Sequence, residues 1–413
     1  MTDLSELVEM ETNDLEMIPE IVPLDARLSV KGSVEKMVEL FERAANITPV
    51  KEILSGTSHA LLETFEESSK GSAYARVYST DGEISLATVV DHFIVSKEGK
   101  ALVPPRKILS ILKLAPASTI AIIVVGNTIT LRSGRAVWTV ATIAGDELAS
   151  VPDLREISLQ SVPRLPLLSA LIVTKKAVST NTARPALVQA KIHNGEITSC
   201  DGSRIHRQRV DGLPKTISTT ILSTTMDELI KGLSKSDAET VGIGVSNNFL
   251  TFSYGSDYLI SSRMQTAFPS VEALILAPAM DNEDTLVVDR DELAAVVKRV
   301  RVNADPEHTA VFLKVVPGKK LDSGETSWSL AVRAFDSHGN SSQEVMEAQW
   351  SGEGKAREIC LNHRHLNDLL VSCPEATVPL KLGTDTKTKR SPVFVEFPEL
   401  NGFTAVLQQI RVE

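Results

Sequence analysis

The chain has little of three features that mark other classes of protein: aromatic residues, cysteines and long apolar runs. Aromatics make up only 4% of its 413 residues, so its cores must be filled largely by Val, Ile, Leu and Ala. Cys200, Cys360 and Cys373 are too few and too scattered for a disulfide framework. No run approaches the roughly 18 apolar residues of a membrane span. Segment 1–25 is acidic and lacks the basic-then-apolar layout of an export signal, so we expect a protein of the reducing cytoplasm.

Signatures of catalysis are also missing or broken. Gly242–Asn247 lacks the third glycine of a dinucleotide-binding loop and lies in an expected strand. Gly354-Lys355 has no glycine five positions earlier and no Ser or Thr after it, which excludes a phosphate-binding loop. The eight histidines show no metal-ligand spacing, and no Gly-x-Ser-x-Gly elbow occurs. We therefore expect no cofactor, no metal site and no enzymatic activity.

Positive charge is scarce as well, since the formal net charge is −10. Affinity for phosphate needs clustered Lys and Arg, and overall acidity repels DNA at long range. The length suggests about two to four domains. Composition alone therefore favours an acidic cytosolic protein with no role on nucleic acid, and only a more specific pattern could outweigh it.

An internal repeat near 120 residues provides that pattern. The run Asn127–Gly134 has a counterpart in Asn248–Gly255, 121 residues later. Upstream, Thr80-Asp81-Gly82 recurs as Cys200-Asp201-Gly202 at a separation of 120. Phe335–Gly339 is a weaker third copy of this turn. Two independent markers with one period indicate a duplicated unit.

Each unit is expected to contain two helices and antiparallel strands. Apolar residues at helical spacing predict helices over 34–45, 104–115, 165–179, 225–235, 289–300 and 362–373. Thr225 with Glu228, and Asp289 with Glu292, have the spacing of a capping box. The β-branched run Thr119–Ile143 reads as a three-strand meander that Val241–Met264 repeats. Hairpins in place of βαβ crossovers predict an α+β fold with three tandem domains.

Five segments carry a resemblance to one family: Ala101–Lys113, Leu131–Arg135, Cys200–Arg204, Phe268–Val271 and Leu293–Ala304. Their order, spacing and threefold repetition resemble the bacterial DNA polymerase III β subunit, the sliding clamp. The third segment is similar to the Thr-Asp-Gly-His-Arg segment of that family, and the fourth to its Phe-Pro-Asp-Tyr. The resemblance implies DNA-clamp domains at 28–156, 157–282 and 283–413, after an acidic tail, 1–27, that has no counterpart. A divergent or phage-encoded member would fit.

The resemblance implies a head-to-tail homodimer that forms a six-domain ring around double-stranded DNA. Such a processivity factor tethers a DNA polymerase and other partners, is placed by a clamp loader, and works in the cytoplasm at the nucleoid, or in a host cytoplasm if phage-encoded. Because a ring holds DNA by encircling it, it need not bind phosphate tightly. The net negative charge therefore does not argue against a role on DNA. Cations in or at the ends of the expected helices would line the hole: Lys36, Arg43, Arg106, Lys107, Lys113, Lys175, Lys176, Lys231, Lys235, Lys298, Arg299 and Arg301. Asn181 and Arg184 follow the third helix, where the family contacts the duplex, although Pro185-Ala186 replace aromatic residues common in relatives.

The resemblance also implies an apolar pocket that binds short partner peptides between the second and third domains. The matching positions are Cys200, Gly202, Arg204, Ile205, Pro269, Leu274, Val406, Ile410, Arg411 and Val412. The apolar side chains would supply burial and the arginine would supply orientation. Ser203 replaces the family's His, and Gln409–Glu413 replaces its Met-Pro-Met-Arg-Leu ending. We therefore predict an altered peptide preference.

The subunit interface is expected to join an edge strand carrying Trp138 and Val140 to Val300 and Val302 of the other chain. Two-chain closure needs complementary, unlike surfaces at the two ends. An exposed Trp on an edge strand is otherwise an aggregation hazard.

Two alternatives stay open. One is a clamp-like interaction protein that binds polymerase or host replication factors without encircling DNA. The other is an unrelated α+β enzyme. A closing dimer favours the clamp, and a stable monomer favours either alternative.

Overall fold

The computed structural model describes residues 22–49, 58–67, 72–145, 148, 157–264, 266–272, 276, 279, 284–320, 326–352, 357–382 and 392–410. Contacts between residues divide the chain into two compact units. Unit 1 comprises Met1–Gln160 and Ser236–Ser262, and unit 2 comprises Ser161–Lys235 and Arg263–Glu413. The predicted second domain therefore contributes to both units. The division into three domains stays a prediction.

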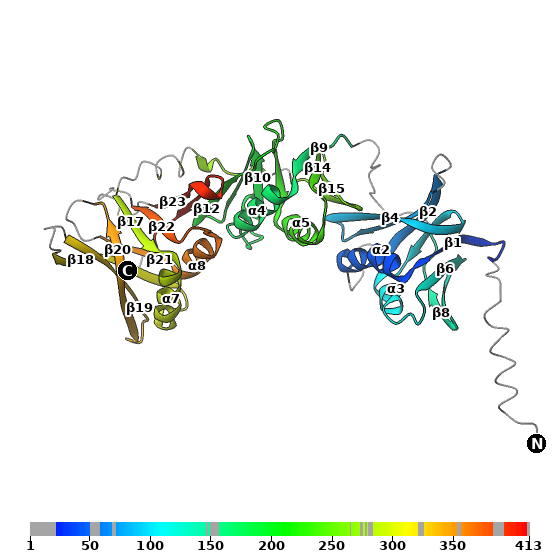
Figure 1. Cartoon of the computed structure of the whole chain (residues 1–413), viewed down its shortest axis with the longest axis horizontal. Coiled ribbons are helices and arrows are strands. Elements are labelled where there is room, and N and C mark those ends of the chain that lie inside the picture. Colours follow the sequence, from blue (N-terminus) through cyan, green and yellow to red (C-terminus); the bar gives the residue numbers. More distant parts are fainter. Residues whose placement is uncertain are drawn as a thin grey trace, which may run out of the picture. The chain divides into compact units, whose positions relative to one another are not determined.

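The described part of unit 1 is one antiparallel sheet with two helices packed side by side on it (Figure 1). Its elements are β1 (Ala26–Ser33), α2 (Val34–Ile47), β2 (Ala60–Glu67), β3 (Ser72–Thr80), β4 (Ile84–Lys97), β5 (Gly99–Val103), α3 (Pro105–Leu112), β6 (Thr119–Val125), β7 (Thr128–Ser133), β8 (Ala136–Ala141), β14 (Thr240–Val245), β15 (Phe249–Tyr254) and β16 (Asp257–Ser262). The strand order is β8-β7-β6-β1-β4-β16-β15-β14, with β2 beside β3 and β5. Apolar residues of both helices, such as Met37, Phe41 and Ile108, are fully buried against the sheet.

Unit 2 contains a second antiparallel sheet, and four α-helices are defined among its described residues. Its elements are β9 (Gln160–Pro163), α4 (Arg164–Lys175), η3 (Pro185–Leu187), β10 (Gln189–His193), β11 (Glu196–Cys200), β12 (Arg204–Arg209), β13 (Thr219–Leu222), α5 (Ser223–Lys235), β17 (Asp284–Asp289), α7 (Arg290–Val300), η5 (Arg301–Asn303), β18 (Ala310–Lys320), β19 (Thr326–Phe335), β20 (Ser341–Trp350), β21 (Glu358–Asn362), α8 (His363–Ser372), β22 (Thr377–Leu382), β23 (Val393–Phe397), η6 (Pro398–Leu400) and β24 (Phe403–Leu407). The strand order is β13-β10-β11-β12-β24-β23-β22-β17-β20-β19-β18-β21. The predicted α+β architecture is confirmed in both units.

The predicted helices are present, with two corrections at their ends. Asp289 caps α7 by accepting from the Glu292 backbone N–H at 2.8 Å, and Asn362 caps α8. The capping box at Thr225 is wrong, because α5 begins at Ser223 directly after β13 and buries Thr225 completely. The third helix ends at Lys175 and not at residue 179, since the next residues turn toward η3.

The internal repeat is confirmed at its turns. The Asp81 carboxylate accepts from the backbone N–H of residues 83 and 84 at 2.9 and 2.8 Å. The Asp201 carboxylate does the same for residues 203 and 204 at 2.8 and 3.0 Å. Gly82 and Gly202 share a φ of 96°, which favours glycine. Asp336 builds a turn one residue longer, accepting from residues 338 and 340.

The last hairpin of one repeat extends the sheet of the preceding repeat, and this pairing creates the candidate site. In unit 1, Ser85 of β4 lies opposite Ile260 of β16. In unit 2, Ile205 of β12 lies opposite Val406 of β24. Both pairs directly follow the aspartate turn. Of the helices described, none has the length and apolar character needed to cross a membrane.

Candidate functional site

An apolar cluster lies where β24 joins β12. Its buried members are Cys200, Ile205, Val271, Leu276, Ala279, Phe394 and Val406, and Leu187 and Phe268 pack against it half-buried. Three predicted pocket residues, Cys200, Ile205 and Val406, are therefore brought together. Pro269 is half-buried two residues before Val271, and Gly202 lies in the adjoining turn.

Ile410 is not a member of the cluster, and three other predicted pocket residues lie outside the described residues. Ile410 is half-buried, and its backbone N–H donates to the Cys360 carbonyl at 2.9 Å. Leu274, Arg411 and Val412 lie outside the described residues.

Six residues of the cluster were not among the predicted pocket residues: Leu187, Phe268, Val271, Leu276, Ala279 and Phe394. Phe394 pairs with Val406 across β23 and β24, so locating that hairpin would have found it. Leu187 lies in a single 3₁₀ turn, which has no periodicity to detect.

The first repeat has the same backbone frame with more polar side chains. Thr80 and Ser85 stand where the unit 2 cluster has Cys200 and Ile205. Thr251, which pairs with Ile260, corresponds to Phe394. The apolar character of the unit 2 site therefore depends on side-chain identity and does not follow from the fold alone.

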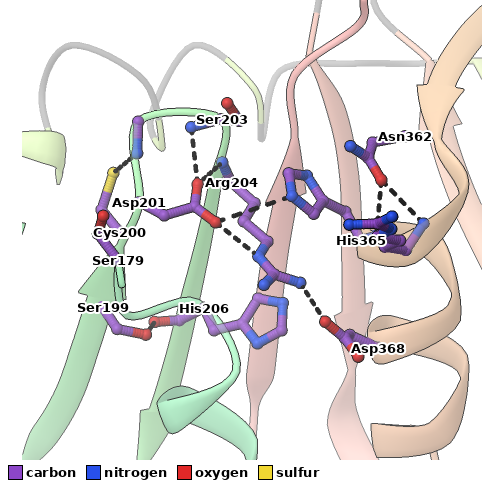
Figure 2. Close-up of polar contacts among 12 residues, drawn as sticks. Ser179, Ser199, Cys200, Asp201, Ser203, Arg204, His206, Asn362, His365 and Asp368 are labelled. Carbon is purple, nitrogen blue, oxygen red and sulfur yellow. Dashed lines mark hydrogen bonds and ion pairs between the residues drawn. The ribbon is translucent and has the colours of Figure 1, made fainter. Parts of the chain in front are cut away.

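Arg204 forms the centre of a polar network beneath this site (Figure 2). Its Nε donates to Asp201 Oδ2 at 2.9 Å, and its Nη1 donates to Asp368 Oδ2 of α8 at 2.6 Å. The Arg204 side chain is only 10% exposed. Lys176 adds a second link to α8 by donating from Nζ to the Asp368 carbonyl at 3.3 Å. Arg204 thus connects the aspartate turn to α8 through hydrogen bonds from two nitrogens of its guanidinium group.

Burial lowers the pKa values of the other cations around Arg204. Burial lowers the pKa of the Lys176 ammonium, which Asp368 partly opposes. Burial also lowers the pKa of His365, and the Arg204 charge adds to that effect. Burial raises the pKa of the Cys200 thiol, so Cys200 lines the site as a neutral, weakly polar side chain. The arginine is the fixed charge of the network.

His206 is a completely buried, neutral histidine next to this network. Its Nδ1–H donates to the Val173 carbonyl at 2.7 Å, and its ring meets Phe403 edge-on at 5.3 Å. Its Nε2 has no partner among the described residues. Burial lowers the pKa of His206 to about 4.

We predict that His206 makes the protein sensitive to acid. In the unfolded chain His206 binds a proton near pH 6.5, whereas in the folded chain it binds one only near pH 4. The free energy of unfolding therefore decreases as the pH falls between these values. The shift corresponds to about 3 kcal/mol of unfolding free energy. Urea unfolding of His206→Asn, whose amide can still donate to Val173, is expected to flatten that pH dependence. His338→Asn, at an exposed turn, serves as the control and should leave the pH dependence of the unfolding free energy unchanged. If His206→Asn showed the same pH dependence of the unfolding free energy as the unmodified protein, the prediction would be wrong.

Most of the predicted lining cations are engaged in contacts within the chain. Partners are found for Lys36 (Glu39), Arg43 (Asp257 and Tyr254), Arg106 (Thr48 carbonyl), Lys175 (Asp227), Lys176 (Asp368 carbonyl), Lys231 (Glu228) and Arg299 (Glu344). The other five are exposed and form no ion pair among the described residues: Lys107, Lys113, Lys235, Lys298 and Arg301.

The two residues predicted after the third helix lie close to the Asp201 turn. The Asn181 side chain accepts from the Ala183 backbone N–H, which shapes the loop. Arg184 Nη1 lies 3.2 Å from the position that a Cβ would take on Gly202. Arg184 therefore borders the apolar cluster.

Comparisons with known proteins agree on one family. The family described as "DNA polymerase III beta subunit, N-terminal domain" matches residues 72–152. The beta sliding clamp of Synechococcus elongatus is 25% identical over 266 residues, which cover 62% of this chain and 68% of that clamp. The Caulobacter vibrioides clamp is 29% identical over 182 residues, covering 44% and 43%. The chain is a distant member of the bacterial β sliding clamp family.

The solved structures extend the fold match to the whole length of a clamp chain. The DNA polymerase III subunit beta of Pseudomonas aeruginosa superimposes with a TM-score of 0.81 at 18% identity, covering 93% of this chain and all (100%) of that one. Caulobacter crescentus pol III beta gives a TM-score of 0.79 at 19% identity, with the same coverage. The predicted clamp fold is confirmed. Membership of the clamp family also supports the expectation of a non-catalytic chain.

Two strand edges of this clamp-family chain are open among the described residues. In unit 1, β8 is the outermost strand, and it exposes Val137 at 59% while Trp138 packs half-buried against the core. In unit 2, β17 pairs with β20 only at Gln349 and Trp350, which leaves the outer edge of the preceding residues of β20 open. Val345 on that edge is 55% exposed.

The four predicted interface residues differ in exposure. Val140 and Val300 are buried in the cores of their own units, with exposures of 7% and 2%. Val302 in η5 is 79% exposed, and η5 is tied to the start of β20 by a hydrogen bond from Asn303 to the Ser341 carbonyl. Val302 and the half-buried Trp138 are thus the predicted residues that a partner could reach.

Proposed function

We propose that the protein is a DNA polymerase processivity factor that closes as a head-to-tail homodimer around duplex DNA. The observation that carries this proposal is the superposition on the full length of the Pseudomonas aeruginosa β subunit. The proposed partners are a DNA polymerase, a clamp loader and a second copy of the chain, in the cytoplasm. The net charge of −10 suits a ring that holds DNA by topology and does not bind it tightly.

The two open edges support closure of the ring. An unpaired strand edge exposes backbone N–H and C=O groups that a second strand can bind. We infer that β8 of one chain pairs with β20 of the other, so that Val137 meets Val345 on one sheet face and Trp138 approaches Val302 on the other.

The charges beside the two edges are complementary. Arg132 and Arg135 are exposed next to β8, and Glu347 is exposed on β20. Opposite charges on unlike edges favour head-to-tail contact over contact between like edges.

The apolar cluster in unit 2 is the proposed docking site for partner peptides. Half-buried Leu187 and Phe268 offer apolar surface to a ligand, and the Arg184 guanidinium borders them. Ser203 in the adjoining turn replaces the family's histidine, which supports an altered peptide preference. Normal affinity for a standard clamp-binding peptide would contradict that preference.

Phe268→Ala is expected to weaken binding of a partner peptide about tenfold, because aromatic anchors at the centre of a docking site contribute most of the affinity. Fluorescence anisotropy of a peptide from the cognate polymerase measures the change. Phe335→Ala is the matched control, since Phe335 is 40% exposed on another part of unit 2. Equal affinities of the two variants would remove Phe268 from the docking site.

Retention on DNA tests the function as a whole. The protein, loaded by a clamp loader or at high concentration, should stay on circular duplex and leave linearised duplex through its ends. Equal behaviour on the two substrates would contradict encirclement.

A second candidate is an interaction protein that never encircles DNA. The many helix cations already bound to carboxylates favour it, because they reduce the attraction available for phosphate. A stable monomer that still binds polymerase peptides would select this alternative.

A further inference from the structure

The negative charge of the chain is concentrated in the acidic tail, 1–27. Its first 25 residues include eight Asp and Glu and no Lys or Arg, so they carry −8 of the net −10. Residues 26–413 are close to neutral, with a formal charge of −2. An exposed basic surface near the start of residue 26 would attract such a tail, because the covalent link holds the two at a high effective concentration.

The open edge of β8 in unit 1 is such a surface. Among the described residues β8 is the outermost strand and pairs only with β7 (Figure 1). Arg132 and Arg135 are exposed beside it and form no ion pair with any described residue. Val137 lies opposite Arg132 on the outer face and is 59% exposed. Trp138 lies opposite the buried Leu131 on the inner face and is half-buried. The edge therefore combines a basic outer face, an apolar inner face and open backbone groups.

The sequence of the tail complements these two faces. The first 21 residues lie outside the described part of the chain. Their sequence alternates acidic and apolar side chains over Asp14, Leu15, Glu16 and Met17. In an extended chain, successive side chains point to opposite faces. A strand formed by this segment beside β8 would place the two acids next to the arginines and the two apolar side chains next to the half-buried tryptophan.

The tail joins unit 1 within reach of this edge. A single row of paired residues crosses β1, β6, β7 and β8: Ala26, Val125, Thr128 and Ala141. Three strand spacings of about 4.8 Å place the start of β1 about 14 Å from the end of β8. Residues 18–22 alone span up to about 17 Å when extended. Segment 14–17 can therefore lie parallel to β8, with Met17 toward Ala141.

We propose that segment 14–17 of the tail pairs with the open edge of β8 in the free chain and has to leave it before a second copy can bind there. Proteins commonly cover open sheet edges, because an uncovered edge pairs with other chains. When an extended peptide joins a sheet edge, its backbone supplies affinity and its alternate side chains supply specificity. The pairing concerns one chain alone, and its effect on dimerisation rests on the proposed function.

The size of the effect follows from the short link between the tail and β1. A short flexible link gives an effective concentration of about 1 mM. A segment that binds with a Kd of about 0.1 mM would then cover β8 about ten times as often as it leaves it free. Dimerisation would be weakened about tenfold at each β8 edge, and about a hundredfold for a closed dimer that uses two such edges.

Hydrogen exchange of the β8 amides in the full chain tests the pairing. Val302→Lys with Val345→Lys provides the background, because both residues are exposed in unit 2 and the lysines oppose pairing of a second copy. In this background, Leu15→Ser with Met17→Ser is expected to speed exchange of the β8 amides on the open side about tenfold.

Leu4→Ser with Leu7→Ser is the matched control, since it makes the same change elsewhere in the tail. It should leave exchange of the β8 amides unchanged. If exchange were the same in the control, in Leu15→Ser with Met17→Ser and in the background chain, the tail would not cover β8 and the proposal would be overturned.

A second pair of variants separates a defined contact from diffuse attraction. Asp14→Asn with Glu16→Gln and Asp3→Asn with Glu6→Gln remove the same amount of charge from the tail. Only the first should speed exchange of the β8 amides, because only its acids would lie beside the arginines. Equal effects of the two pairs would show that the tail is attracted without a register, and would overturn the assignment of segment 14–17.

Dimerisation of the chain with an unmodified β20 tests the competition. Leu15→Ser with Met17→Ser should tighten the dimer about a hundredfold, measured by sedimentation over a dilution series. An unchanged dimer constant together with faster exchange of the β8 amides would overturn the competition. If the chain were a monomer at every concentration with and without these substitutions, the proposed ring would fail, while exchange of the β8 amides would still decide whether the tail covers the edge.

Discussion

A chain carrying Val302→Lys and Val345→Lys is expected to be folded, monomeric and unable to remain on circular DNA. Both valines are largely exposed, at 79% and 55%, so their replacement leaves the cores of the chain intact. A lysine on an open edge opposes pairing with another strand, and here it would face the Arg132 and Arg135 side of β8. Like charges brought together in a desolvated interface cost several kcal/mol, so the dimer should weaken at least about a hundredfold. Sedimentation gives the oligomeric state, and retention on circles gives the function.

Val371→Lys is the matched control for this double variant. Val371 is also exposed, at 68%, but it belongs to α8 and to neither strand edge. It should sediment like the unmodified protein. A dimer that survives the two edge substitutions would show that the β8–β20 interface is wrong, and a monomer that is still retained on circles would reject encirclement.

Replacing Arg204 with alanine is expected to have the largest effect on stability. The substitution leaves Asp201 and Asp368 without their common cation, and their side chains are 16% and 36% exposed. Removal of one partner from a buried ion pair typically costs 3–5 kcal/mol. Because Asp368 reaches solvent, we expect about 3 kcal/mol, measured as the loss of unfolding free energy in urea. Peptide binding should weaken too, since the Asp201 turn beside the apolar cluster loses its link to α8.

A double-mutant cycle with Asp368→Asn isolates the link itself. The two substitutions should be non-additive by about 1–2 kcal/mol, because each removes the same hydrogen bond. Lys231→Ala, which breaks a pair whose lysine is 67% exposed, should cost no more than about 0.5 kcal/mol. Additive effects of Arg204→Ala and Asp368→Asn would refute the link between the turn and α8.

Local features of the fold could be predicted from the sequence because they depend on near neighbours. The buried face of α2, with Met37 and Phe41, follows from helical periodicity. The aspartate turns follow from the spacing of Asp and Gly, because the Asp side chain bonds to backbone N–H groups two and three residues ahead. The prediction that Thr225 begins the fourth helix was wrong, because a capping-box spacing can also occur inside a helix. The end of β13 determines where α5 begins.

Features that join distant residues could not be predicted. Arg43 was expected to face DNA, yet its guanidinium binds Asp257 and Tyr254, more than 200 residues along the chain. Arg204 was expected to point at a ligand and is bound to α8. In each case the partner is supplied by a strand or helix of another repeat. Sequence periodicity carries no information about which side chains such elements bring together.

The pairing of β24 with β12 also has a consequence for the order of synthesis. Strand β24 (Phe403–Leu407) pairs with the free edge of β12 (Arg204–Arg209). During synthesis β12 leaves the ribosome about 200 residues before β24. Until then, Ile205 and Cys200 lack Phe394 and Val406, and β12 presents an unpaired edge. A nascent or truncated chain that lacks β23 and β24 therefore has an incomplete apolar cluster. Under the proposed function, a chain without β23 and β24 could not compete for the polymerase, so such incomplete copies would be silent in replication and would not inhibit it.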